Sequence, residues 1–104
     1  MKPDYYILEG RTPIPVADVR EWGRWLEGQK GKRHVADMTL PSGVRVSTVF
    51  LGLDHSFGDG PPMLFETLIF GGPSDGEMWR YSTWEEAETG HKVALALAEA
   101  GAEP

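Results

Sequence analysis

The chain has 104 residues, of which 40% are hydrophobic and 25% charged, a composition typical of a single folded domain over residues 1–104. Its net charge of −6 argues against binding along nucleic-acid backbones, which needs a basic surface, and against an anionic membrane as partner. The absence of cysteine excludes thiol chemistry, disulfides and cysteine-bound zinc. No 18-residue apolar run and no signal-peptide pattern occurs, so we expect a cytoplasmic protein.

The first third of the chain predicts a strand, a loop and a helix. Aromatic and β-branched residues favour a strand over Tyr5–Leu8. The two prolines of Thr12–Pro15 cannot join the interior of a sheet, so this segment is predicted to be a loop. A helix follows and ends near Gly28, and Asp18 either forms a capping box with Glu21 or lies in the first turn. The apolar stripe of this helix is Val19, Trp22 and Leu26, with Trp25 beside it, and Gly23 would let it approach the sheet closely.

The next segment predicts a β-hairpin. Strands over Lys32–Leu40 and Gly43–Leu51 are joined by Pro41-Ser42-Gly43, which is typical of a three-residue loop with a glycine at positive φ. This loop places Leu40 opposite Val44 and Asp37 opposite Ser47. One face of the hairpin is then almost wholly apolar, which supports the register because a one-residue slip would exchange the faces. That face holds Ala36, Met38, Leu40, Val44, Val46, Thr48 and Phe50, and the other holds Asp37, Thr39, Arg45, Ser47, Val49 and Leu51.

The second half predicts one central strand, one short strand and a helix. Met63–Phe70 is largely apolar on both faces, as expected of a central strand. Glu77–Tyr81 can form a short fifth strand. Thr83 and Glu86 fit a capping box that opens the last helix, which ends at Gly101. The apolar stripe of this helix is Trp84, Ala87, His91, Leu95 and Ala98.

These elements predict an α+β fold in the order β-α-β-β-β-(β)-α. We expect two layers, with two helices covering one face of a mostly antiparallel sheet of four to five strands. The other face is then open and carries Arg45, Val49, Leu51, Leu64, Glu66, Leu68 and Phe70. An open apolar face of this size favours a homodimer, and the alternative is that one helix crosses over and covers it.

The eleven-residue segment Gly52–Pro62 is a candidate site, because long loops are often functional. Its Asp54, His55 and Asp59 are ligand types for a divalent metal ion, although their spacing matches no established motif. The alternative is a structural turn in which Asp54 accepts backbone N–H groups. We favour the turn and expect no bound metal and no cofactor. With Phe57, these residues are candidates for binding.

Two further titratable residues are candidates for catalysis beside His55. His91 lies on the stripe of the last helix, where it either acts as a general base facing His55 or Glu66 or is a partly buried histidine bonded to a backbone carbonyl. Glu66 lies mid-strand between Leu64 and Leu68, where a carboxylate is costly unless it is paired. Arg45 on the neighbouring strand is its expected partner. We favour the structural role for both residues.

Three segments carry a resemblance to a known group of proteins. They are Thr48–His55, Phe65-Glu66-Thr67 and Tyr81–Ala87, the last followed by Gly90-His91. Together they resemble small uncharacterised proteins of about this length that are encoded by bacteriophages and bacteria. The group often has methionine after Phe-Glu-Thr, where this chain has Leu68. The resemblance implies a phage-associated accessory protein, in the host cytoplasm if phage-encoded, and it implies no activity, cofactor or catalytic residue.

These observations favour a protein that binds another protein or itself and is not an enzyme. The expected binding residues are Asp54, His55, Phe57, Asp59, Arg45, Glu66 and Leu68. The alternative is a metal-dependent hydrolase or small-ligand-binding protein that uses the loop over residues 52–62. A structural role in a virus particle is a third possibility.

Overall fold

The computed structural model describes residues 3–29 and 32–102 and has the expected α+β fold, with two antiparallel sheets and two helices. A two-stranded sheet pairs β1 with β2, and a four-stranded sheet has the order β3-β4-β5-β6. Every neighbouring pair in the larger sheet is antiparallel. The strand order makes β4 and β5 its central strands, as predicted for β5. The elements are β1 (Tyr6–Glu9), β2 (Thr12–Pro15), α1 (Val19–Gly28), β3 (His34–Thr39), β4 (Arg45–Phe50), β5 (Phe65–Phe70), β6 (Met78–Tyr81) and α2 (Trp84–Ala102).

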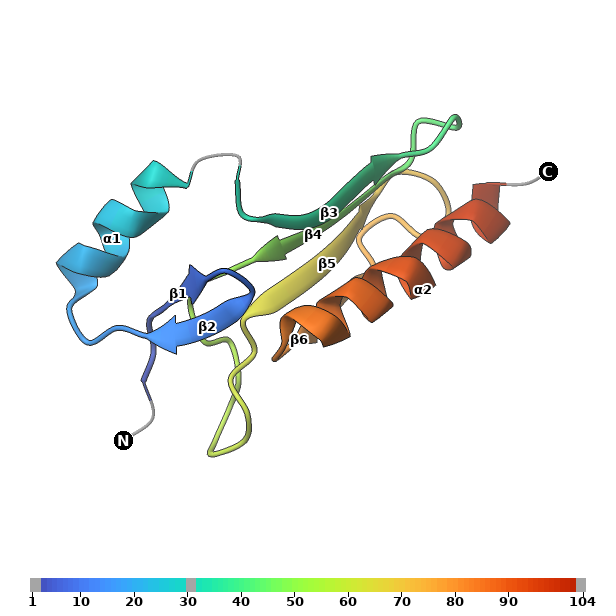
Figure 1. Ribbon diagram of the computed structural model, residues 1–104. Helices are drawn as coiled ribbons and strands as arrows, with labels where there is room; N and C mark the ends of the chain where they lie inside the picture. Colours follow the sequence, from blue (N-terminus) through green and yellow to red (C-terminus); the bar gives the residue numbers. More distant parts are fainter. Residues whose placement is uncertain (1–2, 30–31, 103–104) are drawn as a thin grey trace.

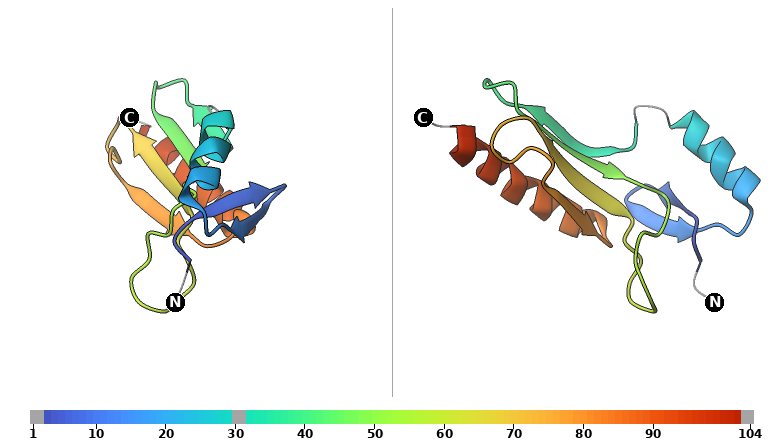
Figure 2. Two further views of the ribbon diagram at one scale, coloured as in Figure 1. Left: turned by 90° about the vertical axis from the view of Figure 1, so that its left-hand side faces the viewer. Right: turned by 180° about the vertical axis from the view of Figure 1, so that it is seen from behind.

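One helix, rather than the two predicted, covers the four-stranded sheet. Helix α2 lies along one face and contacts all four strands, whereas α1 packs mainly against β1 at the far end of the molecule (Figure 1). Seen from behind, the strands lie in front of α2, and neither helix of the described residues covers their near face (Figure 2). The molecule is therefore elongated, with extents of 50 × 30 × 20 Å. Within residues 3–29 and 32–102, neither helix has the length and apolar character needed to cross a membrane.

The prediction of a loop over residues 12–15 is wrong, because this segment forms strand β2 and pairs with β1. The N–H of Val16 donates to the carbonyl of Tyr5 at 2.9 Å, so the N–H groups of alternate residues before Val16 also point towards β1. Pro13 and Pro15 occupy the positions in between, which face away from β1. Their missing N–H groups therefore remove no ladder bond, and a two-stranded sheet tolerates both prolines.

The β3–β4 hairpin has the predicted register. Asp37 lies opposite Ser47, and Leu40 and Val44 are joined by a backbone hydrogen bond of 2.8 Å. Gly43 closes the three-residue loop with a φ of 92°, a conformation that glycine adopts without steric cost. The register shifts between His34 and Ala36, so a bulge ends the regular pairing at one end of β3.

The core lies between α2 and the inner face of the sheet. It forms two adjoining clusters, one around Phe50 and Phe65 and the other around Val46 and Ile69. Leu64 was predicted to lie on the open face but is 1% exposed, within the first cluster. Regular strand alternation begins only at Phe65, so it does not extend to Leu64.

The predicted capping box forms at the start of α2, whereas Asp18 caps α1 through the N–H of Arg20 rather than through Glu21. The Asp18 side chain is the N-cap of α1 and accepts from the N–H of Arg20 at 2.9 Å. Before α2, the Thr83 hydroxyl accepts from the Glu86 N–H and the Glu86 carboxylate accepts from the Thr83 N–H, both at 3.1 Å. These reciprocal bonds are the predicted capping box. The expected packing role of Gly23 is wrong, because a Cβ built there meets no described atom within 4 Å.

Candidate functional site

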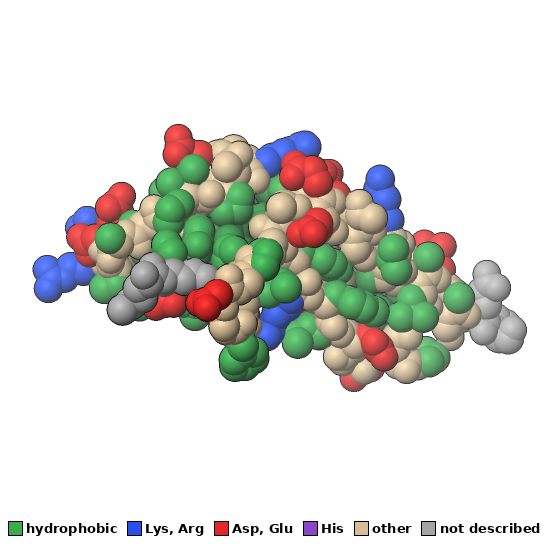
Figure 3. All heavy atoms as spheres, turned by 90° about the horizontal axis from the view of Figure 1, so that it is seen from below, with side chains coloured by type: hydrophobic (Ala, Val, Ile, Leu, Met, Phe, Trp, Pro, Cys, Tyr) green, Lys and Arg blue, Asp and Glu red, His purple; other side chains and the backbone are tan. Residues whose placement is uncertain are grey.

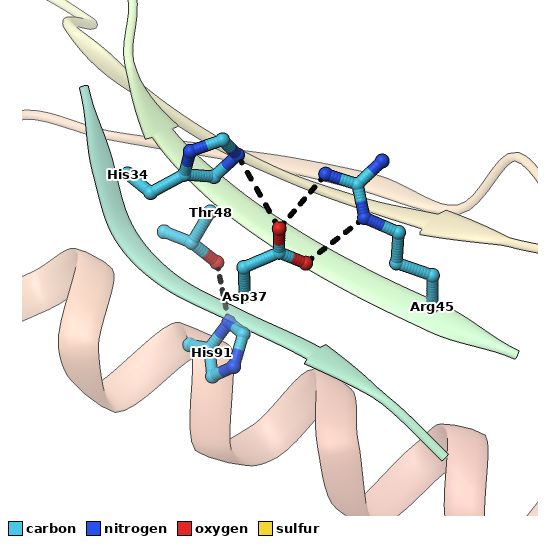
Figure 4. A network of polar contacts seen from close by, with 5 residues as sticks. All are labelled: His34, Asp37, Arg45, Thr48 and His91. Carbon is cyan, nitrogen blue, oxygen red and sulfur yellow. Dashed lines mark hydrogen bonds and ion pairs between the residues drawn. The ribbon is translucent and has the colours of Figure 1, made fainter. Parts of the chain in front are cut away.

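The open face of the four-stranded sheet carries an ion pair between its first two strands. Asp37 on β3 accepts two hydrogen bonds of 2.9 Å from the guanidinium of Arg45 on β4. The Nε2 atom of His34 lies 3.6 Å from the same carboxylate (Figure 4). The hydrogen bonds from Arg45 lower the pKa of Asp37, and those to Asp37 raise the pKa of Arg45. The bidentate geometry holds Arg45 in place on this face.

A second ion pair joins the other two strands, and it corrects the partner predicted for Glu66. The carboxylate of Glu66 on β5 accepts from Arg80 on β6 at 3.2 Å, rather than from Arg45. Glu66 lies directly opposite Arg80 in the strand register. On its other side Glu66 lies opposite Val49, which is four register positions from Arg45, and Arg45 itself lies opposite Phe70. The cross-strand neighbour therefore decides which cation reaches the carboxylate.

Apolar side chains occupy the same face between and beside these ion pairs. Leu68 and Met78 lie opposite each other on β5 and β6, and the guanidinium carbon of Arg45 lies 5.5 Å from the ring centroid of Phe70. Phe70 is 42% exposed and Met78 is 44% exposed. Val49, Leu51 and Leu68 are half-buried. The open face is thus a neutral surface with exposed apolar groups, which suits contact with another macromolecule better than chemistry on a small molecule.

A buried hydrogen-bond network joins α2 to the inner face of the sheet. The Thr48 hydroxyl lies 2.6 Å from the Thr67 hydroxyl. It also lies 2.7 Å from Nδ1 of His91 (Figure 4). The Tyr81 hydroxyl donates to Thr67 at 3.1 Å. His91 is 6% exposed, and its burial lowers its pKa, so the neutral imidazole is favoured. The network satisfies these polar groups within the protein and so serves the docking of α2.

This geometry separates the three candidates for catalysis. His91 from α2 points at Thr48 beneath the sheet, whereas Glu66 lies on the opposite face and is bonded to Arg80. His91 is held by a hydroxyl, where the structural alternative expected a backbone carbonyl. His55 lies in the loop between β4 and β5, and its N–H donates to the carbonyl of Met63 at 3.0 Å. The structure therefore does not bring His55, Glu66 and His91 together.

The loop over residues 52–62 is organised as the turn that the sequence favours. Oδ1 of Asp54 accepts from the N–H groups of Ser56 at 2.8 Å and Met63 at 3.0 Å. The Asp54 N–H donates to the carbonyl of Asp4. Asp54 therefore ties the two arms of the loop together near its base. Across the described residues, no group of three or more His, Asp or Glu side chains is arranged to hold a metal ion.

Sequence reasoning missed the buried network, and it named Phe57 among the binding residues without predicting how exposed its side chain is. Thr48 and Thr67 were assigned to apolar faces, and two hydroxyls among core positions were a signal that they bond to one another. Phe57 is 98% exposed, a placement that hydrophobic patterning does not indicate.

Comparisons with models of protein families, with curated proteins and with solved structures find no match for this chain.

Proposed function

We propose that the protein acts by binding proteins, a second copy of itself included, through the open face of the four-stranded sheet, and that it catalyses no reaction. The observation that carries this proposal is that α2 covers one face of the sheet only, which leaves Leu68, Phe70 and Met78 on the other. Exposed apolar groups on a rigid sheet are typical of an interaction surface.

The charges of this face support self-association. The chain carries a net charge of −6. On this face, however, Asp37 pairs with Arg45 and Glu66 pairs with Arg80, so the opposite charges within each ion pair cancel. Two copies can therefore approach through this face without bringing unpaired acidic groups together. An approach through other, acidic parts of the surface would be opposed by like-charge repulsion.

The size of the face sets the expected affinity. Four strands about 4.8 Å apart and about 20 Å long give a footprint of roughly 400 Å² per chain. This is about half the 800 Å² per partner of a standard stable interface. We therefore expect a dimer with a dissociation constant in the micromolar range or weaker.

Sedimentation velocity from low to high micromolar concentration tests the dimer. We expect the average mass to rise with concentration, and Leu68→Asp to abolish the rise because it places a charge at the centre of the face. Leu97→Asp is the matched control, since Leu97 is 41% exposed on α2 and lies off this face. A wild-type chain that stays monomeric, or equal effects of the two variants, would contradict the proposal.

The resemblance to phage-encoded proteins extends the proposal to an accessory protein that modulates a host factor. Affinity purification from the natural host, with wild type and Leu68→Asp in parallel, tests this extension. A host protein retained by the wild type and lost from the variant supports it. A host protein that is retained by both the wild type and Leu68→Asp would instead bind through another surface.

A further inference from the structure

The connection between β4 and β5 projects from the end of the sheet as an arm with a firm base (Figure 1). The N–H of Leu51 donates to the carbonyl of Leu64 at 2.7 Å, and His55 and Met63 are paired in the same way. Leu53 forms a bridge with Tyr5. Together with the bonds to Asp54, these contacts fix where the arm leaves the fold. Residues 57–60, at its tip, are all exposed.

The tip displays one large apolar side chain. Phe57 is 98% exposed, against 42% for Phe70 and 41% for Leu97, so its ring makes almost no contact with the rest of the chain. A phenylalanine at this position contributes nothing to the core, and a polar residue would suit an exposed turn equally well. A fully displayed aromatic on a defined arm is the geometry of an anchor that fills a pocket in a partner.

The surroundings of Phe57 indicate the charge of that partner. No lysine or arginine occurs between Arg45 and Arg80 in the sequence, whereas the exposed tip of the arm carries Asp59. On the side towards which the arm projects, hydrophobic side chains are abundant and acidic ones are spread over the face, while basic groups lie at the margins and at one place near the middle (Figure 3). An anionic membrane, the other common acceptor of an exposed aromatic, would be repelled by these charges.

We propose that the arm over residues 52–62 is a second interaction site, in which Phe57 inserts into an apolar pocket of a partner protein whose rim is basic. This site is separate from the open sheet face, so it does not depend on the dimer. The apolar pocket supplies affinity through burial of the ring, and the basic rim complements Asp59.

The experiment uses the full chain with the photoreactive analogue p-benzoylphenylalanine in place of Phe57, irradiated in the cells that naturally produce the protein. The control carries the analogue in place of Val93, which is 61% exposed on α2. We expect a protein adduct of discrete mass from position 57 only. The captured protein is then purified and titrated with the unmodified chain.

The titration decides whether the adduct reports the proposed contact. Phe57→Ser should weaken binding by about 30-fold or more, as for a hot-spot residue, and Phe57→Trp should largely preserve it. Added salt should weaken binding, and Asp59→Asn should reduce this salt dependence. Phe57→Ser should leave the sedimentation of the chain unchanged, which separates this site from the dimer.

Several results would overturn the proposal. They are equal adducts at both positions, no discrete adduct at position 57, and binding of the captured protein that Phe57→Ser leaves intact. Co-sedimentation with phosphatidylglycerol or phosphatidylcholine vesicles that is lost in Phe57→Ser would assign the anchor to a membrane instead.

Discussion

The buried network under α2 makes a sharp prediction about stability, because one residue holds two partners. Thr48 is fully buried, and its hydroxyl bonds to both Thr67 and His91. Thr48→Val keeps nearly the same shape and removes only the hydroxyl. Thr67 then retains its bond to Tyr81, whereas Nδ1 of His91 loses the Thr48 hydroxyl and stays buried between α2 and the sheet.

The size of the effect follows from these contacts. Each lost hydrogen bond costs about 1 kcal/mol net, and a buried polar atom left without a partner costs about 1–3 kcal/mol. We therefore expect Thr48→Val to lower the free energy of unfolding by about 2–4 kcal/mol. That is a large share of the roughly 5–15 kcal/mol that stabilises a typical domain.

Urea denaturation at pH 7.5, followed by tryptophan fluorescence, measures this change. Thr39→Val is the matched control, because Thr39 is exposed on β3 and its replacement should change stability by less than about 0.5 kcal/mol. Thr48→Ser, which keeps the hydroxyl, should lose less than Thr48→Val. A Thr48→Val protein within about 0.5 kcal/mol of wild type would refute the idea that the network holds α2 in place.

Two further predictions concern the same helix. Burial lowers the pKa of His91 in the folded protein, so as the pH falls the His91 imidazole is protonated in the unfolded chain before it is protonated in the folded one. The contribution of neutral His91 to stability should therefore be complete above the ordinary pKa of about 6.5. The free energy of unfolding should fall as the pH drops below that value, by at most about 1.4 kcal/mol per pH unit. Urea denaturation between pH 7.5 and 5 should show this slope in wild type and a smaller one in His91→Gln, and equal slopes would contradict the assignment. A Cβ at Gly90 would overlap the Tyr81 side chain, so Gly90→Ala should destabilise by about 1–3 kcal/mol, although alanine favours helices. The matched Gly23→Ala on α1 meets no described atom and should stabilise by up to about 1 kcal/mol, so thermal melts that shift both variants in the same direction would count against the Gly90–Tyr81 contact.

Local sequence chemistry determined the hairpin and the last helix. Pro41-Ser42-Gly43 selects one loop, and that loop sets which residues of β3 and β4 face each other. The stripe through Ala87, His91 and Ala98 marks the buried side of α2, because helical spacing aligns those residues on one face. These features involve residues close together in the chain, so their patterns can be read without the tertiary structure.

Contacts between distant segments decided the remainder. The prolines of β2 are acceptable because that strand belongs to a separate two-stranded sheet, which no local pattern reveals. Glu66 pairs with Arg80 because β6, rather than β4, places a cation directly opposite it. Helix α1 is strongly amphipathic yet has no buried residue, because it packs mainly against β1 and meets the larger sheet at one end, where Trp25 contacts Phe50. The sequence alone therefore determined the strands and helices other than β2, whereas only the tertiary structure decided that β2 forms and which sheet face stays open, because strand order and helix placement depend on the whole chain at once.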